Sequence, residues 1–441
     1  MIEAKLRELE IEPTPTLLRL LRGVKSNISI PNKVEKIIRE DITSSELFTI
    51  HPNSNTAIEL ILLIISNLSD TYHRSLYNTT GGIDRGGYKF LYSPILSTQV
   101  KYNDNTPSPY AKILRLLIKY KIIEKGNNYS KEAKRSNEYR LTNKYFGKGI
   151  IPYIISTDVA RRLRIKEFNT NFQRVLATSI GKNSMLLRSR TTFPSTEEVK
   201  IHLKSLTKAR YTNKKGKRLV TKGKKYYNPD HYVFIEEYIQ RYEYLRDVLI
   251  IPIIDITAGT DARIIDFYNM MPSAIREILP IMGEKFVEVD FSTLHPNITQ
   301  KLWGDNTTPI SHDKVAEDLA ILNGRQVSRA EVKVKHLSFF NKKWEQMQAD
   351  EEMFEYYWLK DKQMMININK DKSDNGYKNT AKRLFQVETN LMENIVTILM
   401  DRGIQVGYVF DAIYCLKGDK EIVRNVMNAV AAHNNILTTA I

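Results

Sequence analysis

The chain has 441 residues, and its 66 Lys and Arg against 50 Asp and Glu leave a formal net charge of +16. A hydrophobic fraction of 42% is enough to bury cores, so a disordered basic tail protein is excluded and two or three domains are expected. The single cysteine, Cys415, excludes an internal disulfide, a four-cysteine zinc site and a Cys-X-X-Cys redox motif. We therefore expect a reducing, cytoplasmic compartment.

The apolar runs and the charge also limit the partners. The longest apolar run, Ala57 to Leu68, contains Glu59 and is shorter than the roughly 20 residues that a membrane span needs. It predicts a core helix, and no membrane is expected. The excess of Lys and Arg favours nucleic acid, because each neutralised phosphate releases condensed counterions. A basic surface that only aids solubility is the alternative.

Residues 1–150 form a predicted nucleic-acid-binding domain of mainly helical character. From Pro109 to Gly126 the apolar residues recur at helical spacing, and residues 136–142 then alternate as a short basic strand. A helix, a turn and a basic strand in this order resemble the last helix and wing of a winged-helix domain. Many small α+β units share the same order.

Residues 151–246 are predicted to be a basic helical region, thumb-like or template-binding. The segment from Lys208 to Lys225 has nine basic residues and no acid, with Gly216 and Gly223 for mobility. Such a loop can neutralise a phosphate backbone, and a solvated hairpin without a ligand is the alternative. The residues expected to contact nucleic acid are Lys214, Lys215, Lys217, Arg218, Lys222, Lys224 and Lys225.

After Arg246 the pattern changes to an α+β layer. Apolar runs predict strands at residues 248–256, 285–291 and 406–416. Long amphipathic stretches predict helices at residues 314–348 and 379–401. We expect an antiparallel sheet with helices packed on it.

Two acids follow apolar strands in this layer, Asp290 after Phe-Val-Glu-Val and Asp411 after Val-Gly-Tyr-Val-Phe. An acid in this position is costly to bury unless a cation compensates its charge. Two carboxylates on neighbouring strands could hold a pair of Mg²⁺ ions about 3.5 to 4 Å apart, as two-metal phosphoryl transfer requires. The alternative is that the acids accept hydrogen bonds from the backbone or from Arg at strand ends.

The segment around Asp290 resembles motif A of the family A (DNA polymerase I-like) DNA polymerases and of the related single-subunit phage-type RNA polymerases. In the DNA enzymes an Asn-containing segment, a Pro and an Arg precede a strand that ends in Asp-Tyr-Ser. Here Asn269, Pro272 and Arg276 precede Asp290-Phe291-Ser292 in the same order.

Residues 329–341 are similar to motif B, the fingers helix of these polymerases. Arg329 and Lys333 are four residues apart and therefore share a helix face, which Leu337 and Asn341 continue. Two cations at this spacing can hold a triphosphate, and a solvated helix face is the alternative. The resemblance implies that Lys333 stabilises charge on the leaving pyrophosphate and that Arg329 binds the terminal phosphate.

Val409-Phe410-Asp411 is similar to motif C, and it follows a helix and a Gly403-Ile404 turn as in that family. The three motifs together imply a right-hand polymerase palm over residues 247–441 with a helical fingers insertion at about 305–380. They also imply two Mg²⁺ ions, or Mn²⁺, held by Asp290, Asp411 and the backbone carbonyl of Phe291. Arg263 and Arg276 are further candidates for nucleotide binding.

Some positions depart from the family pattern. Asn341 stands where the family has a Tyr-Gly pair that stacks under the incoming base, and Phe410 replaces a His. His295 lies five residues after Asp290, where DNA polymerases carry a Glu that blocks the 2′-hydroxyl and RNA polymerases carry a Gly. An imidazole crowds a 2′-hydroxyl but can also donate a hydrogen bond to it, and His295 could instead be a packing residue at a helix start.

The sequence therefore predicts a compact, exonuclease-free, monomeric DNA polymerase of a phage, plasmid or mobile element. Its substrates would be nucleoside triphosphates, and it would act on a DNA template and primer, or on RNA. One alternative is a single-subunit RNA polymerase or primase on the same palm. The other is a catalytically inactive DNA-binding replication or regulatory protein.

Overall fold

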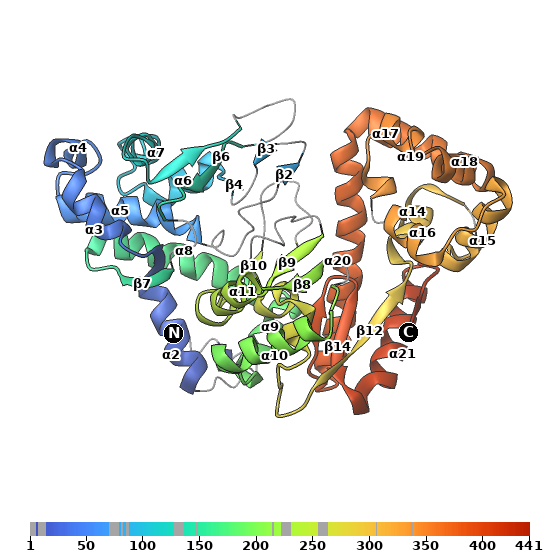
Figure 1. Ribbon diagram of the computed structural model, residues 1–441. Helices are drawn as coiled ribbons and strands as arrows, with labels where there is room; N and C mark the ends of the chain where they lie inside the picture. Colours follow the sequence, from blue (N-terminus) through green and yellow to red (C-terminus); the bar gives the residue numbers. More distant parts are fainter. Residues whose placement is uncertain are drawn as a thin grey trace. The chain divides into compact units, whose positions relative to one another are not determined.

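A computed structural model describes most of the chain (Figure 1). The described residues are 6–7, 15–69, 79–80, 83–84, 88–127, 136–145, 149–213, 216–221, 231–254, 263–305, 307–336 and 338–441. Helices and small sheets occur throughout, so the predicted α+β class is confirmed. In the part of the chain that is described, no helix is both long and apolar enough to cross a membrane.

The chain divides into two compact units, and each is described by itself. The first unit consists of Met1–Gln173, Phe193–Ile251 and Met270–Leu279. The second unit consists of Arg174–Thr192, Pro252–Asn269 and Pro280–Ile441.

The first unit is built around the apolar helix α5 (Ser54–Ser66), whose residues from Thr56 to Ile65 are all buried. The predicted core helix is therefore confirmed. Its one acid, Glu59, accepts hydrogen bonds from the backbone N–H and the hydroxyl of both Ser156 and Thr157. These donors stand just before α8 (Asp158–Leu176), so the buried carboxylate fixes the start of that helix.

The other N-terminal elements of the first unit are α2 (Pro15–Ser26), β1 (Asn27–Pro31), α3 (Val34–Asp41), α4 (Ser44–Phe48), β2 (Thr79–Thr80), β3 (Ile83–Asp84) and β7 (Ile150–Ile154). Of these, β1, α3 and α4 contact α5. Strand β1 pairs antiparallel with β7, so residues from the two ends of this region meet.

Next to α5 lies a group of two helices and three strands: β4 (Lys89–Phe90), α6 (Ser93–Val100), α7 (Tyr110–Lys119), β5 (Ile123–Lys125) and β6 (Glu138–Leu141). The strands form an antiparallel sheet in the order β4-β6-β5. The strand predicted at residues 136–142 is confirmed as β6. The segment predicted as helical from Pro109 to Gly126 is a helix only as far as Lys119, because Ile123–Lys125 form strand β5. The winged helix itself stays a prediction.

The rest of the first unit is mainly helical. Its elements are α10 (Thr196–Lys208), β8 (Arg218–Val220), β9 (Tyr232–Phe234), α11 (Ile235–Asp247) and α13 (Ser273–Arg276). Of the predicted basic loop, Lys208 ends α10 and Arg218 begins β8, and the Asn213 side chain accepts the Lys217 N–H at 3.0 Å. Arg218 is exposed on β8, whereas Lys214, Lys215, Lys222, Lys224 and Lys225 lie outside the described residues.

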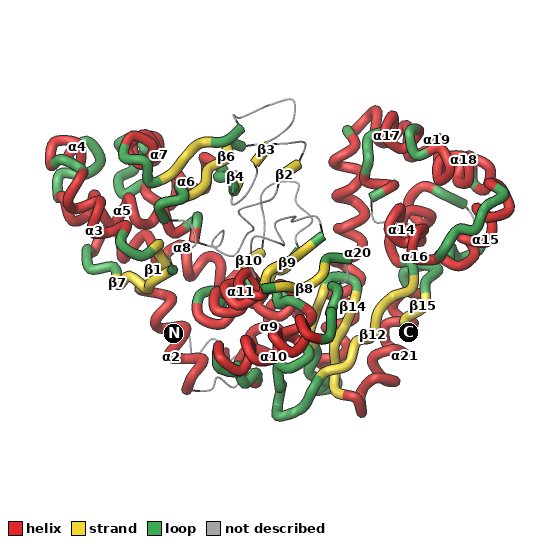
Figure 2. The backbone as a smooth tube through the Cα atoms, in the orientation of Figure 1, coloured by secondary structure: helices red, strands yellow, loops and turns green. Residues whose placement is uncertain are grey.

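The second unit contains a four-stranded antiparallel sheet in the order β13-β14-β12-β15. The strands are β12 (Phe286–Ser292), β13 (Gly407–Val409), β14 (Ala412–Leu416) and β15 (Thr439–Ala440). Figure 2 shows β12 and β14 running side by side. The sheet packs against α21 (Lys420–His433) and α9 (Ser179–Arg190), while α20 (Tyr377–Asp401) packs on both helices. A short 3₁₀ turn, η4 (Lys417–Asp419), leads into α21.

Two of the three predicted strands need correction. Residues 406–416 are a hairpin of two strands, because the chain reverses at Phe410 and Asp411. Of the predicted strand, residues 248–254 are described, and among them only β10 (Ile253–Ile254) is a strand, which pairs with β11 (Ile264–Ile265) outside the main sheet. Apolar composition predicted the burial of these segments but not where the chain turns.

Between β12 and α20 the chain forms a helical insertion, residues 294–375. It consists of α14 (Leu294–Trp303), α15 (His312–Asn323), α16 (Arg329–His336), η3 (Phe339–Asn341), α17 (Trp344–Gln348), α18 (Glu351–Lys360) and α19 (Lys362–Asn375). The single helix predicted at residues 314–348 is wrong, because Gly324, with a φ of 61°, ends α15. The helix predicted at residues 379–401 is confirmed as α20.

A close approach fixes Gly407 at the start of the hairpin. A Cβ at this position would lie 2.3 Å from the ring of Tyr268 in α12 (Phe267–Met270). We expect Gly407→Ala to lower the free energy of unfolding by about 1 to 3 kcal/mol, because the buried ring must move. Thermal and urea denaturation measure this loss. Gly418→Ala, where a Cβ meets nothing within 4 Å, is the matched control, and equal stability of both variants would contradict the packing argument.

Candidate active site

The antiparallel register of β12 and β14 brings the two predicted acids to one end of the sheet. Asp290 lies opposite Ala412, and Asp411 is the residue just before Ala412. Opposed residues in such a ladder have Cα atoms about 4.5 to 5.5 Å apart, so the two acids are neighbours across the sheet. Both side chains are half-buried.

The strand register also directs the backbone of Phe291. Asp290 exchanges both of its backbone hydrogen bonds with Ile441, at 3.3 and 3.0 Å. Backbone groups of successive strand residues point to opposite sides, so the Phe291 carbonyl is directed toward the β14 side, where Asp411 lies.

Left-handed backbone occurs beside each acid. Phe410, directly before Asp411, has a φ of 57°, and Thr293, three residues after Asp290, has a φ of 59°. Bulky and β-branched residues avoid this region, and they persist there only when the surrounding structure holds them. The strain therefore lies in the hairpin turn that contains Asp411 and at the residue that joins β12 to α14.

A third acid, Glu388 on α20, is the centre of a charged cluster near the hairpin. Its side chain is 1% exposed and accepts hydrogen bonds from Arg263 at 2.5 Å and from His295. Two residues predicted to bind nucleotide therefore meet on one buried carboxylate. His295 Nε2 is engaged in this contact.

Aromatic rings enclose the same cluster. The Arg263 guanidinium lies 4.0 Å from the ring centre of Phe385 and 5.0 Å from that of Phe410. The His295 ring lies 5.3 Å from that of Phe385. Arg263 and His295 are therefore held by stacking as well as by the carboxylate. Because Phe410 belongs to the turn before Asp411, the cluster reaches the acid end of the sheet.

The charges of the cluster act on one another. Burial and the nearby negative charge of Glu388 raise the pKa of Asp411. Burial also opposes the charge of Glu388, but hydrogen bonds from His295 and Arg263 outweigh it and lower the pKa of Glu388. Asp411 therefore lies in the negative field of Glu388.

The donor set at the sheet end fits magnesium. No group of three or more His, Cys, Asp or Glu side chains gathers for a metal among the described residues. Mg²⁺ does not need such a group, since it commonly binds one or two carboxylates and completes its octahedron with water and substrate phosphates. Asp290, Asp411 and the Phe291 carbonyl supply oxygen donors of this kind.

Comparisons with known proteins add no identity. No protein-family model matches this chain. No significant match occurs among curated proteins.

The motif B residues lie on α16 in the helical insertion. Arg329 and Lys333 are exposed, and Arg329 pairs with Asp313 at 3.3 Å. Asn341 is half-buried in η3, and Leu337 lies outside the described residues. Arg276 belongs to the first unit, whereas the two acids belong to the second.

Sequence reasoning missed Glu388 and Phe385. Both lie in α20, where Leu384, Leu391 and Met392 are buried. An acid among buried positions of an amphipathic helix was the available signal, because such an acid must find a partner. The sequence did not identify that partner.

The helical insertion contains a second buried polar group. His312 Nδ1 lies 2.9 Å from His336 Nδ1, and His336 Nε2 lies 2.6 Å from the Tyr357 hydroxyl. Burial, with the positive charges of Arg329 and Lys333, lowers the pKa of His312 to about 4. Burial, with the charge of His312, lowers the pKa of His336 to about 3. Both imidazoles are therefore neutral at pH 7.

Acid should destabilise this insertion. The folded-state pKa values lie below the ordinary value of about 6.5, so unfolding takes up protons and its free energy falls as pH drops from 6.5 toward 4. Each histidine should contribute about 2 kcal/mol of loss between pH 7 and 5. Denaturation followed by tryptophan fluorescence measures it, because Trp303, Trp344 and Trp358 are the only tryptophans. An unchanged pH slope in the His312→Phe, His336→Phe double variant would contradict this origin.

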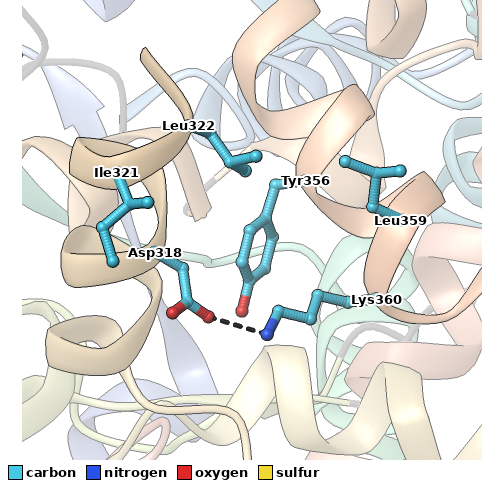
Figure 3. A pocket seen from close by; sticks show the side chains of 6 residues that line it. All are labelled: Asp318, Ile321, Leu322, Tyr356, Leu359 and Lys360. Carbon is cyan, nitrogen blue, oxygen red and sulfur yellow. Dashed lines mark ion pairs between the residues drawn. The ribbon is translucent and has the colours of Figure 1, made fainter. Parts of the chain in front are cut away.

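A separate pocket of about 200 Å³ lies between α15 and α18 (Figure 3). Its polar side is the ion pair of Asp318 and Lys360 at 3.1 Å. Its other lining residues are Ile321, Leu322, Tyr356 and Leu359. It contains neither Asp290 nor Asp411, so it is not the site described above.

Proposed function

We propose that the protein is a template-dependent nucleotidyltransferase, a DNA polymerase that uses two-metal phosphoryl transfer. The antiparallel register that sets Asp290 beside Asp411 carries this proposal. A strand followed by a helical insertion, a long helix and a hairpin is also the order that the palm and fingers motifs imply.

In this mechanism the acid end of the sheet would hold magnesium. Asp290, Asp411 and the Phe291 carbonyl would be its protein ligands. The bound ions would activate the primer 3′-hydroxyl and stabilise charge on the α-phosphate and the leaving pyrophosphate. The rigid ladder between β12 and β14 would keep both carboxylates in place during the displacement.

The charged cluster would position the substrate side of the site. Glu388 orients His295 through a direct hydrogen bond. Glu388 also binds Arg263, whose guanidinium stacks on the ring of Phe385. The engaged Nε2 of His295 favours a steric role over donation to a 2′-hydroxyl, which supports deoxynucleotides. Arg329 and Lys333, on one helix face, would bind phosphates of the incoming nucleotide.

A primer-extension assay tests the proposal. The purified full chain is given primed and unprimed DNA templates, each with deoxynucleotides or ribonucleotides and with Mg²⁺ or EDTA. We expect Mg²⁺-dependent extension of the primed template with deoxynucleotides. Extension with ribonucleotides on unprimed template would favour the RNA polymerase or primase instead. No incorporation under any condition would favour the inactive DNA-binding protein.

A further inference from the structure

Helix α7 lies in a strongly basic part of the first unit. Residues 88–145 contain 12 Lys and Arg but only 4 Asp and Glu. This segment therefore supplies half of the net charge of the whole chain. Its described elements are the sheet β4-β6-β5 and the helices α6 and α7.

The helix separates apolar from basic residues. Ile113, Leu114 and Leu117 are buried in the core of the unit. The exposed residues on the opposite side include Lys112, Arg115 and Lys119. Positions 112, 115 and 119 follow the three- and four-residue spacing of one helix face. The outer face of α7 is therefore a cationic stripe.

The central residue of this stripe, Arg115, is exposed, and the two lysines beside it contact a neighbouring segment. At its edges Lys119 pairs with Glu46, and Lys112 donates to the Thr49 carbonyl at 3.1 Å. Between them Arg115 donates to the carbonyl of Ala111 in its own helix, at 3.3 Å. The neighbouring segment orients the two lysines beside the arginine.

The surroundings of α7 strengthen its positive field. Four more exposed lysines lie in the same group of elements: Lys101, Lys121, Lys125 and Lys144. Glu124 is bound by Arg140 at 2.5 Å, and Glu138 by Asn127 at 2.6 Å. In the described part of residues 88–145, Asp104 is the only exposed acid.

We infer that α7 binds duplex DNA in the major groove through Lys112, Arg115 and Lys119. An α-helix fits the major groove of B-DNA, whereas the major groove of duplex RNA is too narrow for side chains to read. Proteins that bind single strands stack bases on exposed aromatic rings. The exposed positions of α7 carry no aromatic side chain; besides the cations they include Ile118. Helix α7 belongs to the first unit, whereas the proposed catalytic acids belong to the second.

Fluorescence anisotropy of the full chain with a labelled 20-base-pair DNA duplex tests the inference. Lys112→Gln/Arg115→Gln should bind the duplex at least about tenfold more weakly than wild type. The slope of log affinity against log salt should become shallower by about 2, since two phosphate contacts are lost. Affinity for a single strand of the same sequence should change less than about twofold.

The controls separate this site from general charge and from catalysis. Lys36→Gln/Lys204→Gln removes the same charge from exposed positions on α3 and α10 and should retain duplex affinity. An equal loss in that control, or an equal loss on the single strand, would overturn the inference. Asp290→Asn should bind the duplex normally, whatever its effect on nucleotide incorporation. If the double variant has a lowered melting temperature, Arg115→Gln alone repeats the test.

Discussion

Asp290→Asn and Asp411→Asn should each lower Mg²⁺-dependent nucleotide incorporation by about a thousandfold or more. Each substitution removes a negative charge from the proposed metal ligands while it keeps the side-chain shape. Transition-state charge stabilisation by metal ions is worth several kcal/mol, and about 1.4 kcal/mol corresponds to tenfold in rate. Single-turnover extension of a labelled primer at saturating nucleotide measures the loss.

The design of this experiment separates chemistry from folding and from nucleic-acid binding. Asp401→Asn changes an exposed acid of the same unit, at the end of α20, and should retain full activity. The Asn variants should keep the melting temperature and the template affinity of wild type. Near-normal incorporation by either folded Asn variant would refute the two-metal assignment.

Glu388→Ala should lower the free energy of unfolding by about 3 to 5 kcal/mol. It leaves Arg263 and His295 without the buried carboxylate that binds both, and removing one member of a buried charged group leaves the others uncompensated. Urea denaturation followed by circular dichroism measures the change. Glu355→Ala, an exposed acid on α18, is the control and should stay within about 0.5 kcal/mol of wild type.

A second variant tests the cause of that loss. In Arg263→Met/Glu388→Leu the positive and the negative charge are removed together and apolar side chains replace them. Such replacements of complete buried pairs are often neutral or stabilising, so the double variant should be more stable than Glu388→Ala. If both variants are equally unstable, lost packing rather than the uncompensated Arg263 is the cause.

Local patterns in the sequence were sufficient for several elements. A continuous apolar run predicted α5, which is buried all round. Apolar periodicity predicted α7 and α20, because a helix that buries one face must repeat its apolar residues at helical spacing. The apolar run before Asp290 likewise predicted β12. The acids Asp290 and Asp411 stood out because an acid that ends a buried strand needs compensation.

Breaks in the pattern were harder to predict. The run from 406 to 416 is apolar almost throughout, so its composition did not reveal the reversal at Phe410 and Asp411. Gly324 ends α15 by adopting a left-handed backbone. An isolated glycine inside a helical pattern does not by itself indicate where the helix ends. Turns of this kind depend on what the flanking segments pack against.

The sequence by itself determined the α+β class, the helices α5 and α20 and the choice of the two acids, because these follow from residue type and spacing along the chain. Only the tertiary structure decided that Asp411 comes one residue from the position opposite Asp290. It alone showed that Arg263 and His295 both bind Glu388, residues that are 125 and 93 positions away from it. The register of a ladder and the partner of a buried charge are set by long-range packing, which no local pattern records.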